Sequence, residues 1–180
     1  ATSNPPSQRQ ASPKGSCSDP AIQTIVQIAT NIDSNFAERM TAYHNLFMSA
    51  ENIQGNLLEE FISCSVRPYG WIWCNGNVLR AIDFCSSDGA VLLQIKNKSN
   101  TENSSSSAIR TGTDIKKWYR LGTQTKNGVK YPAYKWDSLN NIINSHITTN
   151  LPANCNMTED SYQDSSRYTT PNNTGIISDT

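Results

Sequence analysis

An acid and a polar-x-lysine triplet stand close together near the middle of the chain. Asp83 lies within an apolar stretch, and Gln94-Ile95-Lys96 follows it after a short turn. If the two segments pair as adjacent strands, the acid lies beside the triplet, and Gln94 and Lys96, two residues apart, project to the same face. We therefore expect a carboxylate, an amide oxygen and a cation around one point.

This combination of groups suits metal-dependent hydrolysis of a phosphodiester. Such hydrolysis needs a cation that neutralises the phosphate and makes water nucleophilic, and Mg²⁺ prefers oxygen ligands. Asp83 can supply a carboxylate, Gln94 a side-chain carbonyl and Ile95 a backbone carbonyl. Lys96 would orient or help to deprotonate the attacking water. In the alternative interpretation, Asp83 forms a buried structural salt bridge with Arg80 or Lys96.

A second acid is expected from the helix that precedes these strands. Glu59 and Glu60 both lie at the edge of its apolar face. Either carboxylate could hold water molecules around the metal, or a second metal ion. The alternative for each glutamate is a solvated charge at the edge of the helix.

The spacing of apolar residues predicts the elements that position these groups. Three helices are expected ahead of the sheet, over residues 20–29, 34–50 and 53–64. The pattern then becomes extended, and we expect strands over residues 70–74, 78–85 and 90–96, joined by turns at Asn75-Gly76 and Ser87-Asp88-Gly89. Two successive hairpins predict an antiparallel meander behind a helix. Beyond it we expect a helix over residues 106–121, a strand over 131–136 and a helix from Asp137, its cap, to Ile147.

Length and composition bound the domain organisation. With 180 residues, of which 36% are hydrophobic, the chain has room for one domain. We assign that domain to residues 20–150. Residues 1–19 are rich in Pro, Ser, Gln and Gly and are predicted to be a disordered arm. Residues 151–180 form a polar tail, which is either loose or packed against material missing from an incomplete chain.

Charge and cysteine content exclude some classes of protein. Lys plus Arg equals Asp plus Glu, at 15 each, which argues against a charge-driven, histone-like DNA binder. Five scattered cysteines without a CxxC pair indicate reduced thiols and a cytoplasmic protein. We see neither a signal peptide nor an apolar run of the roughly 20 residues that span a bilayer, and expect no membrane partner.

The predicted helix and meander resemble the core of the PD-(D/E)XK nucleases, an α/β (α+β) fold with a mixed sheet flanked by helices. A closer resemblance, over roughly residues 20–150, is to type II restriction endonucleases of the SinI-like group. It is carried by Asn56-Leu57-Leu58-Glu59-Glu60-Phe61-Ile62 and by Gln94-Ile95-Lys96-Asn97-Lys98-Ser99-Asn100-Thr101-Glu102-Asn103. Both segments coincide with the residues singled out above for their chemistry.

The resemblance implies roles for these residues. Asp83 matches the family acid and Lys96 the family lysine, whereas Gln94 stands where most members have Asp or Glu. This departure removes one negative charge from the metal site, so that a helix carboxylate becomes more necessary. We favour Glu59 for that part, because Gly55 four residues earlier fits a Gly-x-x-x-Glu pattern of similar nucleases.

The resemblance also implies a reaction, partners and DNA contacts. The expected reaction is Mg²⁺-dependent cutting of double-stranded DNA at a short palindrome, GGWCC-like, by a homodimer, with a cognate DNA methyltransferase in the same bacterial genome. Composition alone would make the tract after Lys98 a flexible loop; the resemblance favours a DNA-contacting segment. The expected base readers are Lys98, Asn100, Asn103, Ser105 and Arg110. Lys116 and Lys117 begin the most basic stretch, which continues to Lys130 and would contact phosphates or form a solvated helix face.

Three other hypotheses compete with a site-specific nuclease. A repair or recombination nuclease on the same fold would cut branched or damaged DNA and leave an intact plasmid alone. A nuclease-like protein without catalysis, suggested by Gln94, would bind DNA and never cut it. A secreted, disulfide-bonded binding protein would lack five free thiols.

Overall fold

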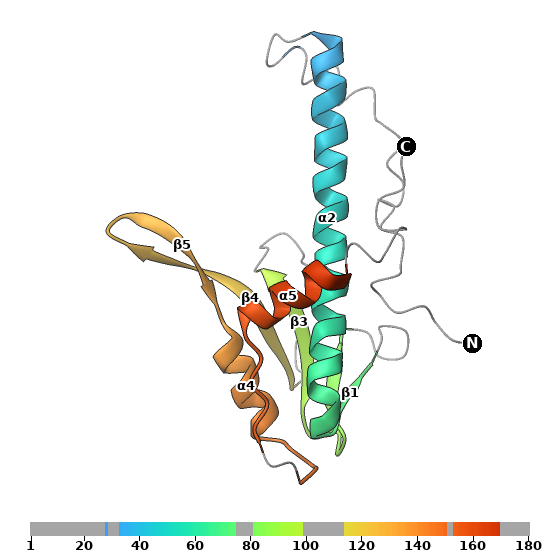
Figure 1. The fold of residues 1–180 in the computed structure, drawn as a ribbon, viewed down its shortest axis with the longest axis vertical. Helices are drawn as coiled ribbons and strands as arrows, with labels where there is room; N and C mark the ends of the chain where they lie inside the picture. The colour runs from blue at the N-terminus through green and yellow to red at the C-terminus, as the bar shows by residue number, and fades with distance from the viewer. Residues whose placement is uncertain (1–27, 29–32, 75–80, 99–113, 151–152, 170–180) are drawn as a thin grey trace, which may run out of the picture.

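The computed structural model describes residues 28, 33–74, 81–98, 114–150 and 153–169. Within them, a five-stranded sheet carries helices packed on one face (Figure 1). The predicted arm, most of the predicted helix over 20–29 and the Asn75-Gly76 turn lie outside the described residues. None of the helices in the described ranges is long and apolar enough to cross a membrane.

One long helix, α2 (Ser34–Val66), replaces the two helices predicted over 34–50 and 53–64. It begins at Asp33, whose carboxylate accepts a hydrogen bond of 2.8 Å from Phe36 N. No proline or glycine separates the two predicted segments, so nothing in the chain stops the helix between them. It ends in a 3₁₀ turn, η2 (Arg67–Tyr69), followed by Gly70 with a φ of 80°.

The sheet order follows the sequence order, β1-β2-β3-β4-β5. The strands are β1 (Trp71–Trp73), β2 (Phe84–Ser86), β3 (Leu92–Lys98), β4 (Ile115–Lys126) and β5 (Val129–Tyr134). The first three form the predicted antiparallel meander, β4 runs parallel to β3, and β5 returns antiparallel to β4. The predicted α+β class with a mixed sheet is confirmed. β2 is shorter than the return strand predicted over 78–85.

The helix predicted over 106–121 is wrong over its described part, because residues 115–121 belong to strand β4. Trp118 and Arg120 are both buried, whereas Lys117 is exposed and Tyr119, which lies between the two buried residues, is only partly buried. Burial of residues two apart is the period of a strand. Pairing with β3 and β5 therefore makes this segment a strand.

The hydrophobic core lies between the sheet and the helices. Leu58 and Ile62 of α2 meet Phe84 and Leu93 of the sheet in one buried cluster. Helix α4 (Trp136–Asn144) adds apolar side chains to the same cluster. The predicted cap of α4 is wrong, because Lys135 occupies the N-cap and Asp137 lies in the first helical turn. There its negative charge still interacts favourably with the positive end of the helix dipole.

The segment after residue 152 contributes to this core. Cys155, Met157 and Tyr162 are each no more than 4% exposed, and helix α5 (Glu159–Thr169) crosses α2 (Figure 1). Asn140 of α4 fastens the segment, because its amide donates to Met157 O and accepts from Met157 N, both at 2.8 Å. The polar tail was expected either to be loose or to pack against material missing from the chain. Residues 153–169 instead pack on the described domain itself.

Candidate functional site

The carboxylate of Asp83 is fixed where β2 and β3 separate. Leu93 is the register partner of Phe84, and its carbonyl also accepts a 2.9 Å hydrogen bond from Asp83 N. Two successive residues thus face one residue of β3, the arrangement of a β-bulge. Asp83 Oδ2 accepts a 2.7 Å hydrogen bond from Ile95 N. A side-chain oxygen therefore occupies the place of a main-chain acceptor, and the carboxylate lies against β3.

Gln94 and Lys96 flank this contact on the face of the sheet opposite the core. Leu93 and Ile95 point into the core, so the residues that alternate with them project to the other face. Gln94 is 3% exposed, and in the described part of the chain its Oε1 is a buried oxygen without a hydrogen-bond donor. The expected meeting of an acid, an amide oxygen and a lysine is found here.

The next strand adds a cation and a phenol to the same face. In the parallel register, Lys117 is the partner of Gln94 and Tyr119 the partner of Lys96. The amine of Lys117 lies 5.0 Å from the centre of the Tyr119 ring. The sequence analysis placed Lys117 among the phosphate-contacting residues on a helix. The parallel strand β4 instead sets it directly beside the candidate site.

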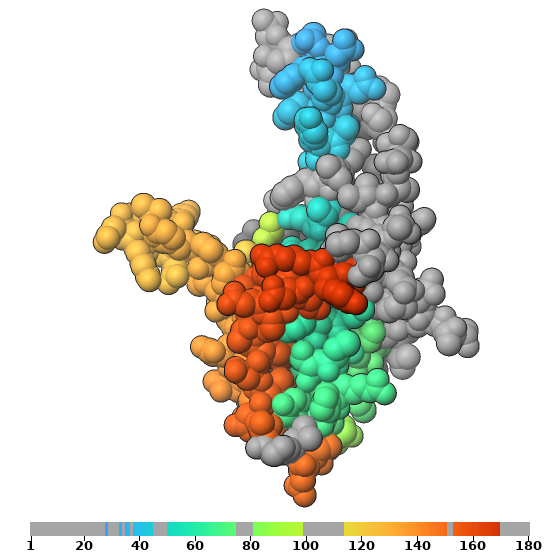
Figure 2. Space-filling view, in the orientation of Figure 1, coloured from blue at the N-terminus to red at the C-terminus, as the bar shows by residue number. Residues whose placement is uncertain are grey.

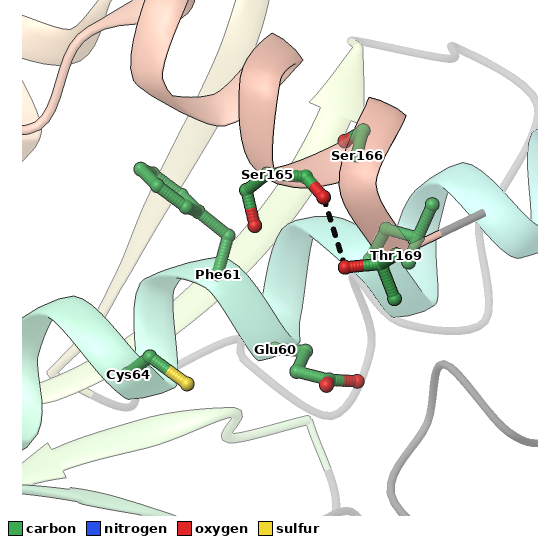
Figure 3. Close-up of a pocket in the computed structure, with 7 residues that line it drawn as sticks. Glu60, Phe61, Cys64, Ser165, Ser166 and Thr169 are labelled. Atoms are coloured by element: carbon green, nitrogen blue, oxygen red, sulfur yellow. Dashed lines mark hydrogen bonds between the residues drawn. The ribbon is translucent and has the colours of Figure 1, made fainter. Parts of the chain in front are cut away.

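Glu60, one of the two candidate helix acids, faces helix α5. A pocket of about 180 Å³ between α2 and α5 is lined by Glu60 and Phe61 on one side and Ser165 and Thr169 on the other (Figure 3). Glu59 is turned about 100° further round the helix, because an α-helix has 3.6 residues per turn. Glu60 thus lines a pocket between two helices, and the choice of Glu59 over Glu60 stays a prediction. Both glutamates are partly buried and have interaction partners.

The predicted DNA-contacting residues are spread over different environments. Lys98, at the end of β3, forms a 2.9 Å ion pair with Glu51 of α2. Lys116 and Lys117 are both exposed, but as neighbours on a strand they project to opposite faces of the sheet, where a helix would have kept them on one side. The other predicted base readers, Asn100, Asn103, Ser105 and Arg110, lie outside the described residues.

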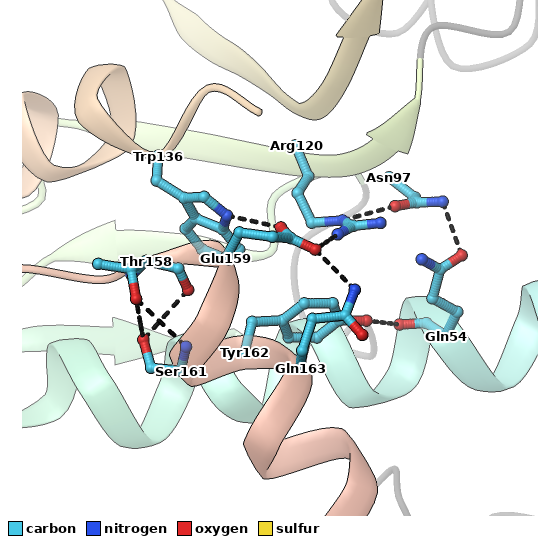
Figure 4. Close-up of polar contacts among 9 residues, drawn as sticks. All are labelled: Gln54, Asn97, Arg120, Trp136, Thr158, Glu159, Ser161, Tyr162 and Gln163. Atoms are coloured by element: carbon cyan, nitrogen blue, oxygen red, sulfur yellow. Dashed lines mark hydrogen bonds and ion pairs between the residues drawn. The ribbon is translucent and has the colours of Figure 1, made fainter. Parts of the chain in front are cut away.

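A buried charged network was missed by sequence reasoning. Arg120 is 4% exposed; its Nη1 donates to Glu159 Oε1 and its Nε donates to Asn97 Oδ1 at 2.9 Å (Figure 4). Trp136 Nε1 donates to Glu159 Oε2 at 2.8 Å. Arg120 is therefore unavailable for the phosphate contacts expected of the basic stretch. Instead it joins β3 and β4 to helix α5.

Two thiols lie next to Asp83 on the same face. Cys74 Sγ and Cys85 Sγ are 3.7 Å apart, and Cys74 N donates to Asp83 O at 2.8 Å. Burial, the neighbouring Cys85 and the Asp83 charge together raise the pKa of Cys74 to about 12. A neutral thiol is the form that this apolar, negatively charged surrounding favours.

The residues at this site fit a hard divalent cation through oxygen atoms. Asp83 supplies a carboxylate that accepts a hydrogen bond from Ile95 N, and Gln94 supplies a buried carbonyl oxygen without a donor among the described residues. Such an oxygen is costly to bury unless something binds it. Among the described side chains, no group of three or more His, Cys, Asp or Glu residues is placed to hold a metal. The fit therefore rests on Asp83 and Gln94.

Comparison with known proteins identifies relatives for most of the chain. The sequence profile of the SinI restriction endonucleases matches residues 5–150. Type II restriction enzyme Eco47I of Escherichia coli is 40% identical over 141 residues, which are 76% of this chain and 59% of that enzyme. Type II restriction enzyme SinI of Salmonella infantis is 39% identical over 120 residues, 64% of this chain and 52% of that enzyme. The chain thus spans little more than half the length of these curated relatives.

Proposed function

Because the chain belongs to the SinI restriction endonuclease family, we propose that it is a type II restriction endonuclease that hydrolyses phosphodiester bonds of double-stranded DNA. The single observation that best supports the proposal is the hydrogen bond from Ile95 N to the Asp83 carboxylate. It holds the acid between Gln94 and Lys96, as the chemistry inferred from the sequence requires. The proposed target is a short GGWCC-like palindrome.

The proposal extends to partners. A palindrome is read most simply by a symmetric pair of subunits, so we propose a homodimer. A nuclease of this specificity endangers the genome that encodes it, so a cognate methyltransferase belongs to the proposal. The proposed setting is the bacterial cytoplasm, where the free thiols of Cys64, Cys74, Cys85 and Cys155 stay reduced.

Asp83 and Gln94 would hold the Mg²⁺ ion, together with the backbone carbonyl of Ile95. The expected helix acid, Glu59, belongs to α2, which packs on the opposite face of the sheet, and is left out of this ligand set. A bound Mg²⁺ would supply positive charge beside the scissile phosphate and make a nearby water molecule more acidic. Gln94 contributes an oxygen without a charge. The net negative charge of the ligand set is therefore smaller than it would be with two strand carboxylates.

Lys96 is proposed as the residue that acts on water. It follows Gln94 by two positions and therefore projects to the same face, and its side chain is only partly buried. From there its amine can orient the attacking water, accept or relay a proton, and counter the charge that builds up on the phosphate in the transition state. Lys117 on the adjacent strand adds positive charge near the same point.

The proposal is tested by incubating the purified protein with unmethylated phage DNA and Mg²⁺, beside Lys96→Ala. We expect discrete fragments from the wild type and none from Lys96→Ala, while binding of duplex DNA in Ca²⁺ is largely preserved. Arg67→Ala is a matched control, because it removes an exposed cation of η2, outside the candidate site and the basic stretch. A Lys96→Ala protein that cuts at nearly the wild-type rate would refute the role of Lys96.

A second candidate is a DNA-binding protein of this fold with impaired catalysis. Gln94, in place of an acid, is the observation that favours it. This protein would shift labelled DNA in a gel but leave phage DNA uncut with Mg²⁺ and with Mn²⁺. A repair nuclease of the same fold would instead cut a branched junction and spare the linear DNA.

A further inference from the structure

The outer half of the β4–β5 hairpin is a ribbon of only two strands. The register of β4 with β3 ends at Leu121. Beyond that residue β4 pairs only with β5, from Leu121 opposite Tyr134 to Lys126 opposite Val129. Figure 2 shows this part standing clear of the body of the molecule. At about 3.4 Å per residue, six paired residues give an arm roughly 20 Å long.

A tight two-residue turn makes the arm well defined. Asn127 has a φ of 52° and Gly128 a φ of 77°, the left-handed pair of conformations that matches the twist of a hairpin. Asn-Gly is the sequence that adopts it at least cost. The arm is therefore a built element whose strands are held in a single register up to the tip.

Residues 115–135 carry positive charges and no negative ones, in a chain whose net charge is zero. Residues 115–135 contain six of the 15 Lys and Arg residues and no Asp or Glu. Arg120 is buried against Glu159, and the other five cations are exposed. Their positions are Lys116, Lys117, Lys126, Lys130 and Lys135. Clustered cations without neighbouring acids make a local field that attracts a polyanion.

Each face of the arm combines a lysine with an aromatic ring and polar groups. One face pairs Lys126 with Val129 and Gln124 with Tyr131, and the other pairs Thr125 with Lys130. Val129 and Tyr131 are 52% and 46% exposed. Tyr134, on the face of Thr125 and Lys130, is 45% exposed, so both faces of the arm offer aromatic surface for contact.

The free edge of the arm is unsuited to pairing with another strand. Pro132 lies in the middle of β5 and has no N–H to donate. Lys130 beside it places a charge on the same edge strand. Proline and lysine on an edge are the usual protection against strand addition. A second copy of the chain joined strand to strand along β5 is therefore disfavoured, and we look to the side chains and charge of the arm for its means of recognition.

We propose that the β4–β5 arm, residues 121–134, is a clamp that binds duplex DNA outside the candidate catalytic site. The inference rests on the proposed function for the identity of the polyanion. The major groove of B-DNA admits a two-stranded ribbon, so an arm of this width can enter it. Lys126 on β4 and Lys130 on β5 lie on the two strands that form the edges of the ribbon, and they contact the phosphates on either side of the groove. Tyr131 and Gln124 face the bases.

The test compares two double variants that carry the same net charge. Lys126→Ala/Lys130→Ala removes the arm lysines, and Arg67→Ala/Arg167→Ala removes two exposed cations elsewhere. Affinity for a fluorescein-labelled GGWCC duplex is measured in Ca²⁺ by anisotropy at several salt concentrations. For the arm variant we expect affinity to fall about tenfold or more and the slope of log K against log salt to decrease by roughly 1.8, because each phosphate contact contributes about 0.9.

A second measurement does not depend on loss of binding. p-Benzoylphenylalanine in place of Tyr131 should cross-link to the duplex under near-ultraviolet light, whereas the same residue in place of Tyr168, exposed on α5, should not. Unchanged affinity and salt slope in the arm variant, with a wild type that binds and cuts, would overturn the clamp and leave the proposed function standing. A wild type that binds and never cuts, with a weakened arm variant, would support the clamp and refute the nuclease. A wild type that does not bind DNA would overturn both.

Discussion

Removing the Glu159 carboxylate should destabilise the whole domain. Arg120 and Glu159 have side chains only 5% and 15% exposed, and Glu159→Ala leaves the guanidinium buried without its counter-charge. Breaking one partner of a buried ion pair costs about 3–5 kcal/mol. The variant also takes the acceptor from Trp136 Nε1 and from Gln163 Nε2. Against a total stability of roughly 5–15 kcal/mol, this loss is a large fraction.

The assay is urea unfolding followed by tryptophan fluorescence. With an m value of about 2 kcal/mol per molar urea, the midpoint should fall by roughly 2 M while m stays constant. Asp164→Ala is the matched control, since it breaks the Arg167–Asp164 pair on the same helix, whose side chains are both 74% exposed. There we expect a loss of no more than about 0.5 kcal/mol.

A double variant separates the cost of leaving one buried charge unpaired from the contribution of the ion pair itself. Arg120→Met/Glu159→Leu removes both charges and fills their space with apolar groups, which in other buried pairs is neutral or stabilising. We expect it to regain most of the stability lost in Glu159→Ala. A loss of less than about 1 kcal/mol in Glu159→Ala would refute the reasoning, because residues 153–169 would then contribute no buried electrostatic contact to the domain.

Three further predictions address other parts of the molecule. Gln94→Glu should retain cutting or shift its metal preference, whereas normal cutting by Gln94→Ala, measured on the same DNA, would show that the side chain is not a ligand. The folded-state pKa of Cys74 is raised from 9.0 to about 12, so the stability that Cys74 contributes is present below pH 9 and is lost as pH rises from 9 towards 12. Iodoacetamide at pH 8.5 should therefore label the exposed Cys64 before Cys74. Equal labelling rates of the two thiols, measured by mass spectrometry, would contradict the raised pKa. Gly70→Ala should cost more unfolding free energy than Gly89→Ala. Both glycines have a positive φ, but of the two only a Cβ at Gly70 would clash with another side chain, the hydroxyl of Thr148. Equal losses in urea unfolding would rule out that clash.

The meander and the meeting of Asp83 with Gln94 and Lys96 were predictable because local signals determine them. Ser87-Asp88-Gly89 forms a tight turn, with Gly89 N donating to Ser86 O at 2.8 Å, and a short turn leaves adjacent strands little choice of register. The bulge at Asp83 was not predictable. It depends on a side-chain carboxylate that accepts a hydrogen bond from a main-chain N–H, and no spacing of residues in the sequence indicates such a bond.

The predictions that were wrong concern segments whose structure depends on contacts with residues distant in the sequence. Strand β4 has cations and aromatics at spacings that suit a helix, and only pairing with β3 and β5 makes it a strand. Arg120 and Glu159 stand 39 residues apart, so no spacing in the sequence indicated that they pair. α5 buries only Tyr162 among its own residues, which is too weak an apolar pattern to distinguish a packed helix from a polar tail.

Asp83→Asn tests whether the Asp83 carboxylate, held beside Gln94 and Lys96, is required for cutting DNA. Asparagine keeps the size of the side chain and an oxygen that can accept from Ile95 N, but it removes the charge. The measurement is the rate of cutting of unmethylated phage DNA in Mg²⁺, with urea unfolding and duplex binding in Ca²⁺ recorded in parallel. We predict a folded protein that still binds DNA and cuts at least about 100-fold more slowly. An Asp83→Asn protein that cuts at the wild-type rate would contradict the account.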